Sequence, residues 1–415
     1  MSTWSGTAPG WTAGEGQGGP PYAPWQPPTD IEQRLYEAKA RGDWSAYLDA
    51  LAATELFHAV SRPWADANPG YVRLFPHWDP RTRRHYVTVL TEGMLPCPAP
   101  DPVYMENSLG WYAATWKDPD WWLAVNPGTP CEAYFAATPE HRRLWTHHAQ
   151  RMSGWTRKGR LRTLRVGGVF QGPVAHGLAC GALLCVSNGS LWNAMGWHGT
   201  GYDRERGRLA EWWGITTREE WLSALERLLK GEMSNSSWEF VLEVRRAIAR
   251  EYGGAVEIDH WREVVERVVR GRAEQAAARG AAGPSDPGAE ARRLQHLIGR
   301  IVRYEARFRA DGLLREGEYV TSVLAWDYGR ASKMARWGLG ARFCDVGEAE
   351  RAVVRAGRAG RLEYRSWEAF SAGYVLGRCL HFDDEEFGSW YEEMLNAHRV
   401  LTTDPGSPWL TIPWK

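Results

Sequence analysis

The chain is poor in lysine and has no excess charge of either sign. Only six of its 50 basic residues are lysines, and 50 acidic residues balance them across 415 positions. A neutral protein has no global field that would attract nucleic acid or an anionic membrane. No apolar run approaches the ~20 residues of a membrane helix, and no signal peptide is recognisable. We therefore predict no membrane insertion and a cytoplasmic location.

The sequence also lacks the short motifs of common enzyme classes. It has no phosphate-binding loop, no Gly-x-Ser-x-Gly elbow and no His-Glu-x-x-His motif. Its six cysteines are spread out, and no Cys-x2-Cys or histidine pair completes a zinc set. We expect free thiols in a reducing compartment, and we predict no metal and no cofactor.

Tryptophan is unusually abundant, with 25 residues. Its indole buries a large apolar area but needs an acceptor for its N–H group. Packing inside the core or at an interface explains such a number best, and sugar or peptide binding is the alternative.

Composition divides the chain into segments and indicates an α+β protein. Residues 1–28 form a Gly/Pro-rich tail that we expect to be disordered. A small α+β domain with an antiparallel or mixed sheet and flanking helices is predicted at 29–150. A basic linker at 151–172 then leads into a larger, mainly α-helical domain at 173–415, with a flexible insertion at 271–290.

Helix signals occur in both predicted domains. Thr29 and Glu32 have the spacing of a capping box, and Thr217 and Glu220 repeat it before a helix predicted at 218–230. Strand-like runs follow the first signal at 56–60, 71–75, 85–90 and 121–125.

The strongest local pattern lies between Trp326 and Phe382. Ser366 is a plausible N-cap for a helix ending near Phe382. On that helix Gly373 and Gly377 leave a smooth strip where another helix can lie close.

Several motifs of this half occur in a fixed order. They are Glu211-Trp212-Trp213-Gly214-Ile215, Trp326-Asp327, Ala335-Arg336-Trp337, Ser366-Trp367-Glu368, Leu376-Gly377-Arg378, Asp404-Pro405-Gly406-Ser407-Pro408-Trp409 and Pro413-Trp414. Together they resemble the bacterial domain-of-unknown-function family 1266 over about Pro173 to Lys415. The family usually has an aromatic residue and Trp after its Gly-Arg, where Cys379-Leu380 stands here. The family has no established reaction, so the resemblance implies a fold and no catalytic residue.

A second resemblance covers the first domain. Its paired short helices, a strand through Leu56 and the turn Asn126-Pro127-Gly128-Thr129-Pro130 are similar to the N-terminal domain of the SseB family. The similarity spans about Thr29 to Tyr134 and implies a small α+β domain without catalytic residues.

One polar cluster is the best candidate site. Its members are Asp327, Arg330, Glu368, Tyr374 and Arg378, within an aromatic frame of Trp326, Trp337 and Trp367. Asp327 is placed to reach Arg330 one turn on, and we predict that it also receives Arg378. Such a set fixes helix register as a buried ion-pair network, or it offers a carboxylate base and an arginine anion clamp.

A basic patch precedes this domain, at Arg157, Lys158, Arg160, Arg162 and Arg165. Such a stretch can bind nucleic-acid phosphates, but it falls between the two resemblances and is better explained as a solvated linker.

From the sequence as a whole we expect a non-enzymatic adaptor or scaffold that binds an unidentified protein partner. An enzyme centred on Asp327 and Arg378, and nucleic-acid binding through the basic patch, are the alternatives. The oligomeric state is left open.

Overall fold

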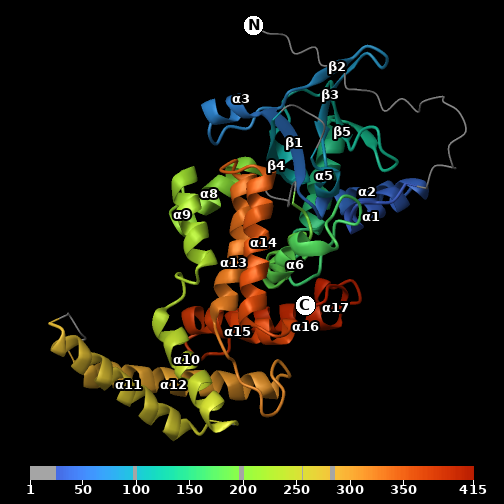
Figure 1. The fold of residues 1–415 in the computed structure, drawn as a ribbon. Helices are drawn as coiled ribbons and strands as arrows, with labels where there is room; N and C mark the ends of the chain where they lie inside the picture. Colours follow the sequence, from blue (N-terminus) through green and yellow to red (C-terminus); the bar gives the residue numbers. More distant parts are fainter. Residues whose placement is uncertain (1–24, 97–100, 196–200, 255, 281–285) are drawn as a thin grey trace, which may run out of the picture. The chain divides into compact units, whose positions relative to one another are not determined.

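The computed structural model describes residues 25–96, 101–195, 201–254, 256–280 and 286–415. They divide into two compact units, whose boundaries are Met1–Trp155 with Arg165–Gly167 and Thr156–Leu164 with Gly168–Lys415, and only the described residues of each are discussed (Figure 1). The first 24 residues of the predicted tail lie outside the described residues. The small α+β region followed by a mostly helical one confirms the predicted fold class.

The first unit is built around two small sheets. Its elements are α1 (Asp30–Ala40), α2 (Trp44–Ala52), β1 (Leu56–Ser61), α3 (Arg62–Ala67), β2 (His77–Asp79), β3 (Arg84–Val89), the 3-10 turn η1 (Glu92–Met94), β4 (Pro102–Asn107), α4 (Leu109–Thr115), β5 (Trp121–Val125), β6 (Ala133–Ala136) and α5 (Pro139–Arg151). β1 pairs antiparallel with β4, and the second sheet has the order β2-β3-β5-β6 with β3 and β5 parallel. The helices α1, α2, α4 and α5 contribute to its apolar core.

A buried network of polar side chains connects a helix and a turn of this unit. The predicted capping box at Thr29 is present, and Glu32 accepts from its backbone N–H at 2.9 Å. The same carboxylate also receives the hydroxyl of Thr91, whose Oγ1 accepts from the side chain of Asn126 at 2.9 Å. Burial raises the pKa of Glu32. The network joins α1 to the Asn-Pro-Gly turn, so it is a structural corner.

Within its described residues, the second unit consists of helices joined by loops and has no β-strand. Its helices are α6 (Gly172–Cys180), α7 (Ala182–Asn188), α8 (Tyr202–Trp213), α9 (Arg218–Leu229), α10 (Ser236–Tyr252), α11 (Ile258–Ala278), α12 (Pro287–Ala310), α13 (Leu324–Gly340), α14 (Val346–Glu363), α15 (Trp367–Phe382), α16 (Ser389–Thr403) and α17 (Pro408–Thr411). α13 lies at the centre and packs against α14, α15, α9 and α6. α11 and α12 form a long hairpin beside this bundle (Figure 1).

Glycine allows the close helix crossing that the sequence predicts. A Cβ on Gly377 would meet the Cβ of Trp326 at 2.9 Å, and one on Gly373 would meet the carbonyl oxygen of Ser322 at 2.5 Å. The backbone of α15 therefore lies directly on the start of α13.

Two local predictions differ from the structure. The run 71–75 is not a strand, because it follows a turn at Gly70 and ends against Pro76, which lacks an N–H for a sheet. The insertion predicted at 271–290 is helical at both ends, since α11 continues to Ala278 and α12 begins at Pro287. Alanine-rich sequence extends the first helix, and Asp286 caps the second. Residues 281–285 lie outside the described residues.

Candidate functional site

Helix α13 is surrounded by protein yet carries four charged side chains. All of its residues except Leu324 and Arg330 are buried. The charged residues recur at every third position, at Asp327, Arg330, Lys333 and Arg336. Burying an ion costs several kcal/mol unless partners compensate for its lost hydration. The contacts of these side chains therefore show whether each buried charge is compensated by partners within the fold.

Both carboxylate oxygens of Asp327 accept hydrogen bonds inside the protein. Its side chain is 0% exposed. It accepts from the hydroxyl of Ser234 at 2.9 Å, from the backbone N–H groups of Ser234 and Met233 at 3.0 and 3.1 Å, and from Arg330. This confirms the pairing with Arg330, whereas the pairing predicted with Arg378 was wrong. The donors come from the loop before α10, about 90 positions away, which helix spacing cannot reveal.

Arg330 lies flat on an indole. Its guanidinium carbon is 3.5 Å from the ring centroid of Trp326 and 5.7 Å from that of Trp213. Burial lowers the pKa of Arg330, while Asp327 opposes this effect. Such a cation–π contact holds the guanidinium in one plane.

Tyr374 and Arg378 lie one turn apart on α15. Burial raises the pKa of Tyr374, and the nearby positive charges of Arg378 and Arg330 oppose the rise. Arg378 stands over the rings of Trp390 and Phe382, at 5.0 and 5.5 Å from their centroids. Its terminal nitrogen is 3.6 Å from a carboxylate oxygen of Glu393 on α16.

A further cationic pair lies deeper along α13. Arg336 donates to the carbonyl oxygen of Leu191 at 2.5 Å and to the thiol sulfur of Cys185 at 3.2 Å. Burial lowers the pKa of Lys333 to about 8. The predicted cluster left out both Lys333 and Arg336. The regular three-residue spacing of charged residues within an otherwise apolar helix is the sequence signal that could have identified these two residues.

The three tryptophans of the predicted aromatic frame lie at two separate positions. Trp326 and Trp337 lie along α13, and Trp337 is 6.2 Å from Trp213. Trp367 lies at the other end of α15, beside Glu368, which is exposed. Glu368 and Trp367 are therefore not part of the cluster at Asp327, because they lie at the first turn of α15, about two turns before Tyr374.

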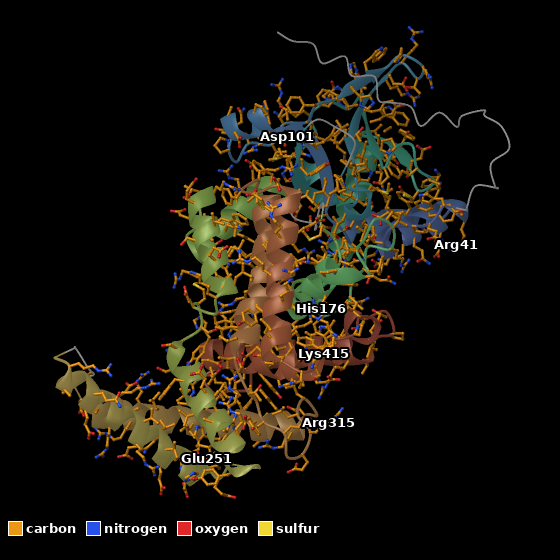
Figure 2. All side chains as sticks on the ribbon, in the orientation of Figure 1. Arg41, Asp101, His176, Glu251, Arg315 and Lys415 are labelled. Carbon is orange, nitrogen blue, oxygen red and sulfur yellow. The ribbon has the colours of Figure 1, made fainter. Side chains whose placement is uncertain are left out.

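Trp367 lies at the centre of a cluster of aromatic rings formed with the C-terminal residues of the chain. Its ring stacks on Trp409 at 5.6 Å and meets the edge of Trp414 at 4.6 Å. His176 lies on α6 (Figure 2). Its ring centroid is 4.9 Å from that of Trp367. The indole N–H of Trp367 donates to the carbonyl oxygen of Ile412 at 2.9 Å. The Pro-Trp motifs that end the chain are thus packing elements.

Aromatic rings form a continuous strip from the interior to the surface of the second unit. We call this the aromatic strip, and its members are Trp238, Trp326, His381, Phe382 and Trp390. Trp326 contacts Trp238 at 6.2 Å and His381 at 5.1 Å between ring centroids. Phe382 stacks on Trp390 at 4.7 Å. The outer pair, Phe382 and Trp390, is 40% and 42% exposed.

The predicted basic patch is not a single solvated stripe. Arg162 is buried and donates to the carbonyl oxygen of Gly189 at 2.8 Å. Lys158, Arg160 and Arg165 are exposed and Arg157 is half-buried. Arg165 falls in the first unit and the other four residues in the second. The stretch is therefore partly built into folded structure.

A cavity of about 300 Å³ lies between α11 and α12, lined by Glu257, Asp259 and Arg303 among others, and none of the predicted site residues lines it. In the described ranges no cluster of His, Cys, Asp and Glu could hold a metal ion. No described helix is long and apolar enough to cross a bilayer.

Comparison with known proteins identifies one family. No curated protein and no solved structure matches the chain. The resemblance to the SseB family is not shown by these comparisons and stays a prediction. The model of the family described as "Protein of unknown function (DUF1266)" matches residues 208–414, which include α13, α15 and the C-terminal tryptophans. The C-terminal half of this chain therefore belongs to the DUF1266 family.

Proposed function

We propose that this protein is a non-enzymatic adaptor that binds another protein through the aromatic strip. Tryptophan, tyrosine and arginine are the residues that dominate binding energy at protein interfaces. Phe382 and Trp390 present such rings at the surface, with the guanidinium of Arg378 directly beside them. This exposed aromatic pair backed by an arginine is the observation that carries the proposal.

The rings rest on a rigid support. Phe382 ends α15 and Trp390 lies in the first turn of α16, and these helices pack against each other. The buried ring of Trp326 contacts the ring of Phe382, at 6.1 Å between centroids. A surface held in one conformation loses little side-chain entropy on binding, so it suits recognition of a partner.

The alternatives have less support. A carboxylate base must be reachable by substrate, whereas Asp327 is 0% exposed and already accepts from Ser234 and Arg330. Nucleic-acid binding through the basic patch would have to do without Arg162, which is buried.

The cysteines fit the expected compartment. The thiols of Cys131, Cys180, Cys185, Cys344 and Cys379 are free and buried. Free thiols are typical of a reducing compartment, so a cytoplasmic location is part of the proposal.

A displayed-peptide selection tests the proposal. The purified full chain should enrich peptides with shared features, and Trp390→Ala should lose them. Leu362→Ala is the matched control, because Leu362 is an apolar residue 90% exposed on α14 and outside the strip. Equal enrichment by both variants, or no enrichment by the wild type, would contradict the proposal.

A further inference from the structure

The β2–β3 hairpin and the segment before it carry uncompensated positive charge (Figure 1). Residues 71–86 contain four arginines against one acidic residue, Asp79, which leaves an excess of three positive charges. Asp79 is engaged in the turn, where it accepts from the backbone N–H of Arg81 at 2.8 Å and from the hydroxyl of Thr82 at 3.1 Å. The four arginines, which are exposed and form no ion pair within the described residues, are Arg73, Arg81, Arg83 and Arg84. This surface therefore favours anions.

Aromatic rings line the face of the same sheet that lies opposite the apolar core. Strand register places His77, Tyr86 and Trp122 side by side on β2, β3 and β5. Tyr134, on β6, lies on the same face. The ring centroids of His77, Trp122 and Tyr134 are 5.8, 6.5 and 5.4 Å from that of Tyr86. The apolar core uses the other face, through residues such as Val87, so these rings lie outside it.

Several of these rings reach the surface next to the arginines. Tyr134 is 44% exposed. The guanidinium carbon of Arg84 is 3.9 Å from the ring centroid of Trp122, so an arginine lies on the aromatic face itself. On the other face of the hairpin, Trp78 is 51% exposed and its ring lies 4.9 Å from that of His85, its partner across the two strands. Exposed rings and positive charge thus occur together on one hairpin.

We propose that the β2–β3 hairpin and the aromatic face beside it bind single-stranded nucleic acid. Arginine side chains neutralise phosphates, and exposed aromatic rings stack on unpaired bases. A duplex keeps its bases stacked on each other, so it would engage only the arginines. An acidic peptide would also engage the arginines, but it would leave the exposed rings of Trp78 and Tyr134 without a flat partner.

This site goes beyond the proposed function, because it lies in the first unit and the aromatic strip lies in the second. It is also compatible with the neutrality of the whole chain. Screening at physiological salt limits interactions between exposed charges to about 8 Å. The local excess of arginine therefore decides which ligands the hairpin attracts.

Fluorescence anisotropy with a labelled oligothymidylate of about 16 nucleotides examines this site in the full chain. The wild type should bind the oligonucleotide at low salt, and it should bind the same sequence more weakly after annealing to its complement. Trp78→Ala should weaken binding of the single strand at least about fivefold, the loss expected when one base loses its stacking partner. Trp44→Ala is the matched control, because Trp44 is 48% exposed on α2 of the same unit. No binding by the wild type, or equal binding by the two variants, would overturn the proposal.

Arg81→Gln examines the charge separately. It should reduce the slope of the logarithm of the binding constant against the logarithm of salt concentration by about 0.7, the share of one phosphate contact with a single strand. Arg143→Gln removes the same charge from an exposed position on α5 and should leave that slope unchanged. Trp390→Ala should bind the oligonucleotide as the wild type does, so failure of the proposed function is distinguishable from failure of this inference. Poly-glutamate or a duplex that binds as tightly as the single strand would contradict the inference, because charge alone would then explain the binding.

Discussion

Ser234 donates both its backbone N–H and its hydroxyl to Asp327, at 3.0 and 2.9 Å. This contact fastens the loop between α9 and α10 to the central helix α13. The pair is buried, so the carboxylate that seemed the best catalytic candidate holds the fold together.

Asp327→Asn should therefore destabilise the second unit strongly. The change removes the charge that compensates Arg330, and breaking a buried ion pair costs roughly 3–5 kcal/mol. The free energy of unfolding, measured in urea, reports the loss. Glu226→Gln is the control, because its pair with Arg355 lies at the surface and contributes less than about 1 kcal/mol. Similar losses in the two variants would show that Asp327 is not a buried anchor.

Trp367→Ala should be nearly as damaging. The indole is buried, stacks on Trp409 and donates to Ile412. Truncating a buried tryptophan costs roughly 3–5 kcal/mol through lost burial and the cavity left behind. Trp212→Ala should cost less than about 0.5 kcal/mol, because Trp212 is 60% exposed. Thermal and urea unfolding of the two variants compare them directly, and equal stability would refute the role given to Trp367.

Two glycines should respond to alanine in opposite directions. A Cβ on Gly338 would lie 2.1 Å from the indole nitrogen of Trp221, which donates to the carbonyl oxygen of Met334. Overpacking of this kind costs about 1–3 kcal/mol. Gly271, within α11, has nothing within 4 Å, so Gly271→Ala should stabilise the protein by up to about 1 kcal/mol. Opposite shifts in the urea midpoint are expected, and shifts of the same sign would contradict the packing around Gly338.

Stability should fall as the pH drops from 7 to 5. Burial lowers the pKa of His176 to about 4, and the nearby charge of Arg361 contributes. An unfolded histidine has a pKa near 6.5, so the unfolded state takes up the proton first. The stabilisation is complete above pH ~6.5 and is lost progressively towards pH 4, by about 2 kcal/mol at pH 5.

His176→Phe isolates this contribution. The phenyl ring would still contact Trp367 and Trp414, as the His176 ring does, but it cannot be protonated. Unfolding free energies at pH 7 and pH 5 should differ by about 2 kcal/mol less in the variant than in the wild type. An unchanged difference would mean that His176 does not titrate in this way.

Local signals in the sequence predicted the elements well. The capping boxes at Thr29 and Thr217 and the N-cap at Ser366 are all present, because each depends on residues three positions apart. The ion pair of Asp327 with Arg330 is local in the same sense.

Long-range pairing was less predictable. Helix spacing does not show that Ser234 and Met233 reach Asp327, or that Arg378 turns towards α16. Tertiary packing decides such choices. The separation of Trp367 from the cluster also follows from packing, since the C-terminal Pro-Trp motifs cover that end of α15.

Binding of a selected peptide to the full chain tests the central claim most directly. Isothermal titration calorimetry should give a dissociation constant at least tenfold weaker for Trp390→Ala than for the wild type, as expected when an interface residue worth more than about 1.4 kcal/mol is truncated. Leu362→Ala should match the wild type. If Trp390→Ala, folded and equally stable, binds the peptide as tightly as Leu362→Ala does, the aromatic strip is not the docking surface.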